Sequence, residues 1–379
     1  MPDSAFAELF SSVDDPRLNR SKQHQLVDIL FVCVAATIAG CDGPTEIVDF
    51  ANQKIGWFRR FVRLENGVPS HDTIGRVLSL VKPDQFQTAF LDWISSFADE
   101  CDDQEQLRLV PIDGKTLRGS RSAKHRQQPL HLVSAWATEQ GITLGQVAVD
   151  SKSNEITAIP KLLEMLELCG AIVSIDAMGC QKEIAKKIVD GGGDYVLTVK
   201  GNQPTLSKAI QLYFLDRYEN DDFAEHACRR HVTSERSRGR LEDRYYTIAP
   251  LPESMKSLCR QWKNLTSIGQ VVTITERGGK QTSDVRYYIS SRDPKVKEFA
   301  SSVRKHWAIE SMHWILDVVF AEDASRIRNG DGPENFGFLR KFVISLLKRD
   351  TSRGSLKGKR KRAGWNTNFL ENILFGSEI

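Results

Sequence analysis

Three acidic residues, Asp113, Asp176 and Glu310, stand in settings typical of a phosphoryl-transfer site. Asp113 ends a short apolar run and is followed at once by glycine, lysine and threonine. Mg²⁺ in proteins is usually held by one or two carboxylates together with substrate phosphates and water. Two such ions can activate an attacking oxygen and stabilise a leaving oxygen. We therefore predict that the three acids bind two Mg²⁺ ions, for which Mn²⁺ can substitute, with Asp113 between the ions.

The first two acids lie at the ends of predicted strands. Apolar segments bounded by turn residues predict five strands, at 107–113, 131–138, 142–149, 171–176 and 195–199. Amphipathic segments predict helices at 155–168, 181–189 and 205–217. This order indicates an α/β fold with a mixed five-stranded sheet. We expect the first and fourth strands to be neighbours, so that Asp113 and Asp176 share the edge where ligands of open α/β sheets bind.

Glu310 lies in a predicted helix at 296–319, beside two histidines and a further acid. His306, Glu310, His313 and Asp317 recur at intervals of four, three and four residues. Residues with this spacing share one face of a helix. We interpret that face as the lining of a cleft, and the alternative is a solvent-exposed stripe.

The remaining pattern divides the chain into five parts. Residues 1–100 predict a helical N-terminal domain, which is a candidate DNA-binding module, and an acidic linker follows at 99–106. The catalytic core would occupy 107–217 and be completed by 293–349, which carries Glu310. Between these parts, 218–292 predicts a β-rich insertion. Residues 350–379 form a basic C-terminal tail, which we expect to be a loop from 351 to 362.

Basic residues predict where a polyanion would bind. Residues 324–362 contain twelve Lys and Arg against three Asp and Glu, although the whole chain has a net charge of only +3. No acid occurs at 114–130. Such clusters are typical of phosphate contacts, and a solvated loop or tail is the alternative for each. The predicted DNA-binding residues are Lys115, Arg118, Arg121, Lys200, Asn202, Arg326, Arg328, Lys359, Arg360, Lys361 and Arg362.

Composition excludes several classes of protein. A content of 40% hydrophobic and 27% charged residues is typical of a globular chain. The longest apolar run, at 29–40, is shorter than the roughly 20 residues that a membrane-spanning helix needs. The seven cysteines form no C-x-x-C pair, which disfavours a zinc site or a disulfide framework. We therefore expect a cytoplasmic protein without a membrane partner, associated with the nucleoid when bound to DNA.

Longer motifs resemble one known family over nearly the whole chain. The most specific are 112–118 (IDGKTLR), 152–160 (KSNEITAIP), 176–181 (DAMGCQ), 306–310 (HWAIE) and 322–328 (EDASRIR). They resemble the DDE transposases of the ISAs insertion-sequence group, also called H-repeat-associated proteins. The resemblance implies an RNase H-like core with a β-rich insertion between the second and third acids. It also implies that Asp113, Asp176 and Glu310 are the DDE triad.

The resemblance further implies Mg²⁺-dependent DNA strand cleavage and strand transfer at the terminal inverted repeats of an insertion sequence. The partners would be those repeats and target DNA, with a homo-oligomer on DNA because two ends must be paired. Broader relatives carry a Tyr-Arg-Glu-Lys pattern, but His306 and Asp317 occupy the Arg and Lys positions here. Asp317 is therefore a candidate extra metal or water ligand. The open alternatives are a catalytically silent DNA-binding relative and a metal-dependent nuclease of the same fold.

Overall fold

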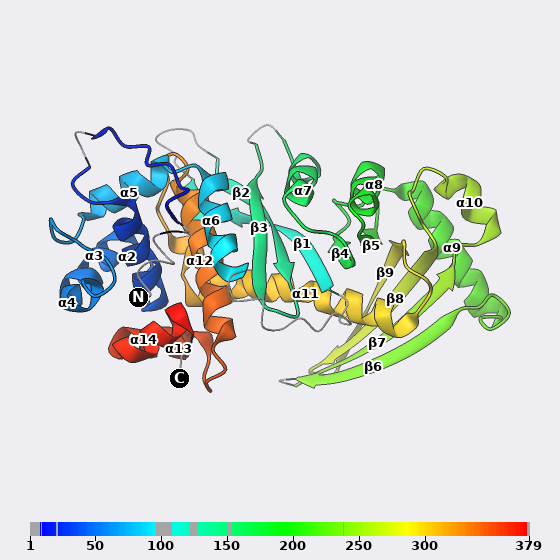
Figure 1. The fold of residues 1–379 in the computed structure, drawn as a ribbon. Coiled ribbons are helices and arrows are strands. Elements are labelled where there is room, and N and C mark those ends of the chain that lie inside the picture. The colour runs from blue at the N-terminus through cyan, green and yellow to red at the C-terminus, as the bar shows by residue number, and fades with distance from the viewer. Residues whose placement is uncertain are drawn as a thin grey trace.

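A computed structural model of the chain describes residues 8, 10–19, 22–95, 108–121, 128–150, 153–237 and 239–376. The described strands form one mixed nine-stranded sheet in the order β3-β2-β1-β4-β5-β9-β8-β7-β6. Helices from both ends of the chain gather beside the β3 edge, and the β6 edge lies at the opposite end of an elongated molecule (Figure 1). No helix in the described ranges is both long and apolar enough to cross a membrane.

The five predicted core strands are confirmed. They are β1 (Arg108–Leu117), β2 (Leu130–Ala137), β3 (Ile142–Ala148), β4 (Ala171–Ile175) and β5 (Asp194–Val199). The helices between them are α7 (Glu155–Glu164), α8 (Lys182–Asp190) and α9 (Pro204–Asn220). β1 pairs in parallel with β4 and antiparallel with β2, so the first and fourth strands are neighbours as predicted. This mixed order is that of the predicted RNase H-like core.

The end of β1 differs from the prediction. Asp113 does not close the strand, because β1 continues to Leu117 through pairing with β2. The parallel pairing with β4 stops at Ile112 and Ile175, one residue before each acid. Asp113 and Asp176 therefore lie where β1 and β4 separate, at the carboxyl ends of their paired segments. We call this place the open edge of the sheet.

The insertion extends the same sheet rather than forming a separate layer. Its elements are β6 (Arg229–Ser237), β7 (Arg240–Pro250), α10 (Glu253–Cys259), β8 (Ser267–Arg277) and β9 (Lys280–Ser290). β9 pairs antiparallel with β5, which makes the sheet continuous. The sequence did not predict β6, because this edge strand is mostly exposed and has few apolar residues. The expected five-stranded sheet is thus the core of a larger one.

Helix α11 (Val296–Val319), predicted with these bounds, crosses the sheet and contacts β1, β4 and β7. Its buried residues include Phe299, Met312 and Leu316. Gly269 on β8 permits this packing, because a Cβ there would lie 2.5 Å from Cζ of Phe299. The helix therefore lies close enough to the sheet to bring Glu310 to its open edge.

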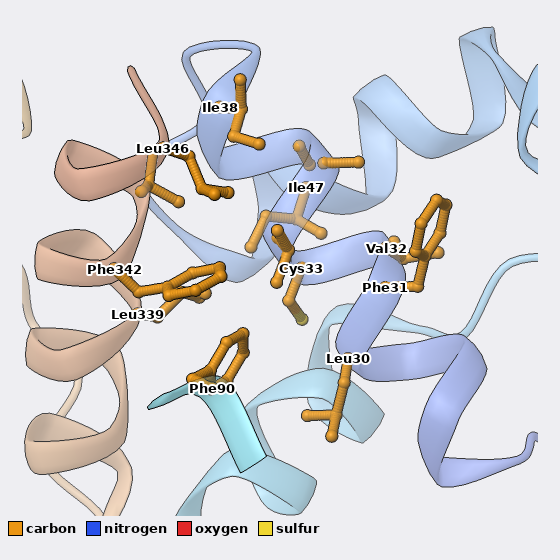
Figure 2. Close-up of a cluster of buried hydrophobic side chains, with 14 of the residues drawn as sticks. Leu30, Phe31, Val32, Cys33, Ile38, Ile47, Phe90, Leu339, Phe342 and Leu346 are labelled. Atoms are coloured by element: carbon orange, nitrogen blue, oxygen red, sulfur yellow. The ribbon is translucent and has the colours of Figure 1, made fainter. Parts of the chain in front are cut away.

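The N-terminal module is helical, as predicted. It contains α2 (Leu26–Ile38), α3 (Pro44–Gln53), α4 (Ile55–Phe58), α5 (His71–Leu80) and α6 (Pro83–Ser95). Ser70 caps α5, because its hydroxyl accepts a hydrogen bond from the Thr73 amide. Buried α2 side chains such as Cys33 face Phe342 of α12 (Gly332–Arg349), as Figure 2 shows. The core of the module is therefore shared with the C-terminal part of the chain.

The prediction of a loop at 351–362 is wrong. The chain forms α13 (Leu356–Trp365) and α14 (Thr367–Phe375). Lys359 and Arg360 are buried, although both were predicted to bind DNA. Arg360 donates to the Thr37 carbonyl at 3.1 Å and pairs with Asp42 at 2.7 Å, while Lys359 pairs with Asp350 at 3.0 Å. Cations favour the carbonyls at helix C-termini, so these two residues fix helices together and are unavailable to DNA.

Candidate active site

Asp113, Asp176 and Glu310 meet at the open edge of the sheet and influence one another electrostatically. Burial raises the pKa of Asp113 to about 7, and the negative charges of Asp176, Glu155 and Glu310 add to this. The pKa of Asp176 is raised by burial and then by Glu155. Burial also raises the pKa of Glu310, and Asp176 contributes in the same direction. Acids that are distant in the sequence are therefore neighbours in the fold.

Asp176 and Glu310 line one small cavity of about 180 Å³ between β4, β5 and α11. Lys200, Arg286 and His306 also line it. The positive charges of Arg286 and Lys200 oppose the effect of burial on the pKa values of Glu310 and Asp176, respectively. The cavity is therefore lined by both positive and negative side chains. A cavity of this kind can accept a phosphate together with the cation that neutralises it.

The donor set fits a hard cation. The acids supply only oxygen atoms, which are the ligands that Mg²⁺ prefers. Burial and then the charges of neighbouring acids raise their pKa values, and a bound cation would oppose both effects. Within the described residues, no three His, Cys, Asp or Glu side chains form a ready-made metal cage. An open set of carboxylates suits ions that take their remaining ligands from substrate phosphates and water.

The two histidines of the polar face of α11 contact the sheet, as the cleft interpretation requires, while Glu310 is exposed at the mouth of the cavity. Nδ1 of His306 lies 2.9 Å from the Ser174 hydroxyl. Nδ1 of His313 lies 3.5 Å from Oδ2 of Asp113. Burial lowers the pKa of His306 to about 4 and that of His313 to about 3. Both rings are therefore neutral at physiological pH, and Nδ1 of His313 faces the Asp113 carboxylate.

Comparisons with known proteins show the family to which the chain belongs. A family model described as "Transposase DDE domain" matches residues 104–346, and one described as "DDE_Tnp_1-associated" matches 7–94. The chain is 39% identical to "Putative transposase YncI" of Escherichia coli O157:H7, over 97% of this chain and 93% of that protein. This chain belongs to the DDE transposase family. The resemblance to H-repeat-associated transposases is thereby confirmed.

Two further comparisons describe the relatives of this transposase. It is 38% identical to "H repeat-associated putative transposase YhhI" of Escherichia coli (strain K12), over 98% of each chain. A chain in the "Cryo-EM structure of piggyBac transposase synaptic complex with hairpin DNA" gives a TM-score of 0.46 at 11% sequence identity. That match covers 100% of this chain and 82% of the other.

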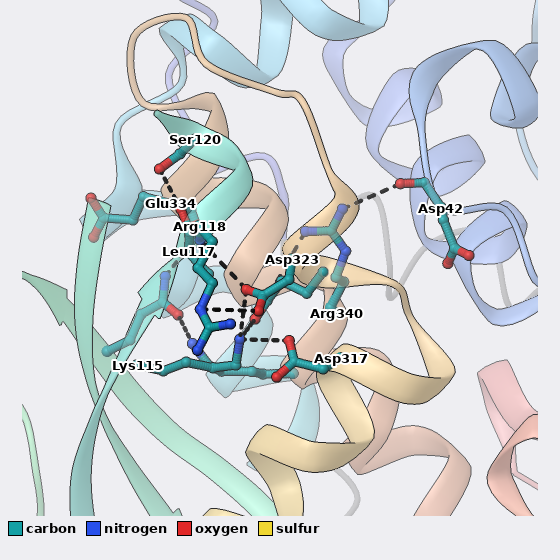
Figure 3. Close-up of polar contacts among 12 residues, drawn as sticks. Asp42, Lys115, Leu117, Arg118, Ser120, Asp317, Asp323, Glu334 and Arg340 are labelled. Atoms are coloured by element: carbon teal, nitrogen blue, oxygen red, sulfur yellow. Dashed lines mark hydrogen bonds and ion pairs between the residues drawn. The ribbon is translucent and has the colours of Figure 1, made fainter. Parts of the chain in front are cut away.

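Lys115 does not lie on the surface of the transposase, contrary to the prediction that it contacts DNA. Its side chain is 9% exposed, and Nζ lies 2.7 Å from Asp317, 3.2 Å from Glu322 and 3.5 Å from Asp323. Behind this group, Arg340 lies 3.9 Å from Glu322 and donates to the Asp42 carbonyl, as Figure 3 shows in part. Asp317, the candidate extra metal or water ligand, therefore forms an ion pair with Lys115.

The other predicted DNA-binding residues fall into two groups. Six are exposed, although Asn202 also donates to the Ala177 carbonyl at 2.6 Å: Arg118, Arg121, Lys200, Asn202, Arg326 and Lys361. Two are half-buried and donate to carbonyls, Arg328 to Gly119 at 3.1 Å and Arg362 to Arg353 at 2.9 Å. The basic residues Lys124 and Arg126 lie outside the described residues.

Two features of the site were not predicted as functional. Glu155, at the start of α7, accepts a hydrogen bond from Nε2 of His131 at 2.7 Å, and its charge acts on both Asp113 and Asp176. Its only signal in the sequence is its position inside the motif at 152–160. A groove of about 660 Å³ runs from Glu310 along the insertion strands, and Arg286 lies over the Trp307 ring there. No local sequence pattern indicates that β9 and α11 are neighbours, so the groove between them could not be predicted.

Proposed function

We propose that this transposase catalyses Mg²⁺-dependent DNA strand cleavage and strand transfer at the ends of an insertion sequence. The observation that carries the proposal is the convergence of the three acids at the open edge, where the charges of Asp176 and Glu310 add to the raised pKa of Asp113 and the charge of Asp176 adds to that of Glu310. The three carboxylates would hold two Mg²⁺ ions, with Mn²⁺ as a substitute. When bound, the ions would activate the attacking oxygen and stabilise the leaving oxygen.

The surrounding side chains would position the acids and the substrate. His313 is neutral, and its Nδ1 lies 3.5 Å from the Asp113 carboxylate. It can therefore help to orient that carboxylate without placing a positive charge where a metal ion would bind. Lys200 and Arg286 line the cavity beside Asp176 and Glu310, where they can contact a phosphate oxygen. Positioning of this kind lowers the barrier of a displacement because the reacting groups are already aligned.

The substrate DNA would lie across the open edge and into the groove beside α11. The exposed cations Arg118, Arg121, Lys200 and Arg326 can contact phosphates without regard to sequence. Lys200 lies beside Asp176, and Arg326 lines a second hollow beside α3 and α5. Trp307 and the exposed Trp314 line the groove next to Glu310 and offer flat surfaces to a strand. We further propose that the protein acts as a homo-oligomer on DNA, because an insertion sequence has two ends and each end needs its own active site.

Purified protein tests the proposal with DNA that carries the element's own ends. In Mg²⁺ the protein should nick at the ends, and pre-cut ends should join to a target duplex. Asp113→Asn, Asp176→Asn and Glu310→Gln should each reduce both reactions to background without lowering the unfolding midpoint below that of the parent. Glu164→Gln, which removes an exposed acid on α7, is the matched control.

The alternatives give different results. DNA binding without nicking, in Mg²⁺ and in Mn²⁺, would identify a catalytically silent relative. Nicking without joining of pre-cut ends would identify a nuclease of the same fold. Full activity in all three triad variants would overturn the assignment of the site.

A further inference from the structure

Glu155 belongs to a chain of three side chains beside the triad. Nε2 of His131, on β2, lies 2.7 Å from Oε1 of Glu155. Nδ1 of the same ring lies 2.8 Å from the Thr116 hydroxyl, on β1. The imidazole is therefore held at both nitrogens, and it fixes the Glu155 carboxylate in one place. The Glu155 side chain is 14% exposed, so it lies within the protein rather than in solvent.

Gly114 shows how close this carboxylate lies to the triad. A Cβ on Gly114 would lie 2.2 Å from Oε1 of Glu155 and 2.4 Å from Nε2 of His131. The His131–Glu155 pair thus packs directly on the backbone of the residue that follows Asp113. Asp113 faces His313 of α11. Because successive residues of a strand point to opposite faces, the pair beside Gly114 lies on the face opposite α11. Glu155 and Glu310 therefore approach the open edge from opposite sides.

The charge of Glu155 acts on the two strand acids. Its repulsion raises the pKa of Asp113, and for Asp176 it is the largest contribution after burial. A further negative charge beside those of Asp113 and Asp176 is unfavourable in the folded protein unless a cation balances it.

Attachment of α7 to the sheet does not require the hydrogen bond between His131 and Glu155. The helix already buries Ala158, Ile159, Leu162 and Leu163. Asn154 caps its N-terminus by accepting from the Ile156 amide. An apolar residue at 155 would fasten the helix without placing a further carboxylate near the two acids, so the position of Glu155 points to a role in binding.

We propose that Glu155 is a fourth acid of the metal-binding edge, held in position by His131, and that it increases the affinity of the site for divalent cations. The inference rests on the proposed function, because the triad must bind the ions that Glu155 helps to attract. His131 acts through Glu155 and is a positioning residue. Supporting groups around metal ligands typically contribute about 10–100-fold in metal affinity, which sets the effect expected here.

Mn²⁺ binding to the full chain without DNA tests this role, with free Mn²⁺ measured by electron paramagnetic resonance. Glu155→Gln keeps the size and hydrogen-bonding capacity of the side chain and should weaken binding by about tenfold or more. His131→Asn should weaken it in the same direction. Glu164→Gln removes the same charge from the exposed end of the same helix and should bind Mn²⁺ like the parent.

Unfolding in EDTA separates this role from a structural one. The Glu155→Gln variant should be as stable as the parent or more stable without metal, and Mn²⁺ should raise its unfolding midpoint less. A lower midpoint in EDTA together with parental Mn²⁺ affinity would show that Glu155 only fastens α7, and would overturn the inference. If Asp113→Asn loses Mn²⁺ binding while Glu155→Gln does not, the inference fails and the proposed function stands. If the parent neither binds Mn²⁺ nor nicks DNA, both fail.

Discussion

The ammonium group of Lys115 lies 2.7 Å from the carboxylate of Asp317 and joins two elements that are 202 residues apart in the sequence. Lys115 follows Asp113 by two residues on β1, and Asp317 follows Glu310 by two helical turns on α11. The contact therefore connects the strand that carries the first acid with the helix that carries the third. Glu322, which is 1% exposed and lies 3.2 Å from Lys115, completes the group on its buried side.

Lys115→Met should destabilise the protein, because it leaves the buried Glu322 carboxylate without its nearest cation. Removing one partner of a buried ion pair typically costs about 3–5 kcal/mol. We expect the lower end of that range, since Arg340 also faces Glu322 at 3.9 Å. Urea unfolding at neutral pH measures the loss.

The double variant Lys115→Met/Glu322→Leu is the control for this prediction. Replacing both charges with apolar side chains removes the unpaired carboxylate, so much of the lost stability should return. Equal instability of the single and double variants would show that Lys115 stabilises the fold through packing and not through charge.

Asp113→Asn should make the metal-free protein more stable at neutral and alkaline pH. The folded-state pKa of Asp113 is about 7, above its ordinary value of 3.8. The stability that this group contributes is thus fully present below about pH 4 and is lost as the pH rises through about 7. Asparagine cannot ionise, and a pKa difference of this size corresponds to on the order of 4 kcal/mol.

Unfolding in EDTA between about pH 4 and pH 8 checks this expectation. The advantage of Asp113→Asn should grow with pH and shrink again when Mg²⁺ is added, because the ion binds the folded parent. Asp150→Asn, at an exposed position, should follow the parent at every pH. An advantage that is constant with pH would contradict a role for Asp113 ionisation.

Local patterns predicted the elements of the catalytic core but not their charged contacts. The bounds of α11 were predicted because its apolar residues recur with helical period. The neighbouring positions of β1 and β4 followed from the order of strands and helices. The same reasoning failed for Lys115 and Arg360, which were interpreted as surface cations and are buried. Local sequence contains no information on which distant carbonyls or carboxylates will surround a cation.

Glu155 shows the same limit within the site. Its partners are His131 on β2 and the glycine that follows Asp113, and these are brought together only by the sheet. In the sequence it is the first acid of an amphipathic helix, where acids are common because they favour the helix N-terminus. Its place beside the triad is a tertiary property that periodicity does not encode.

Removing the exposed cations Arg118 and Arg326 should weaken DNA binding by removing electrostatic contacts to phosphates. Each phosphate contact contributes about 0.9 to the slope of log affinity against log salt concentration. Arg118→Ala and Arg326→Ala should each reduce that slope by about one contact on duplexes of any sequence. Fluorescence anisotropy across a salt series measures it. Lys256→Ala, at an exposed position on α10, should leave the slope unchanged, and a parental slope in both arginine variants would exclude this surface as the DNA contact.

Two glycines of the β1 region should respond differently to the same substitution. A Cβ on Gly119 would lie 1.9 Å from the Ser325 carbonyl oxygen, which is backbone, so Gly119→Ala must displace the loop that carries Arg326. Overpacking of this kind costs about 1–3 kcal/mol, and DNA affinity should fall with it. A Cβ on Gly114 would meet only the side chains of Glu155 and His131, which can move. Gly114→Ala should therefore cost less stability but weaken Mn²⁺ binding.

Chemical denaturation, Mn²⁺ titration and DNA binding of both alanine variants distinguish these outcomes. Gly201→Ala is the control, since a Cβ there would have no atom within 4 Å. The contrast depends on the type of atom that each Cβ meets, backbone for Gly119 and flexible side chains for Gly114. If Gly114→Ala retained parental Mn²⁺ affinity, displacement of Glu155 would have no effect on the metal site. Equal losses of stability in both variants would show instead that the Glu155–His131 pair is as rigid as the backbone.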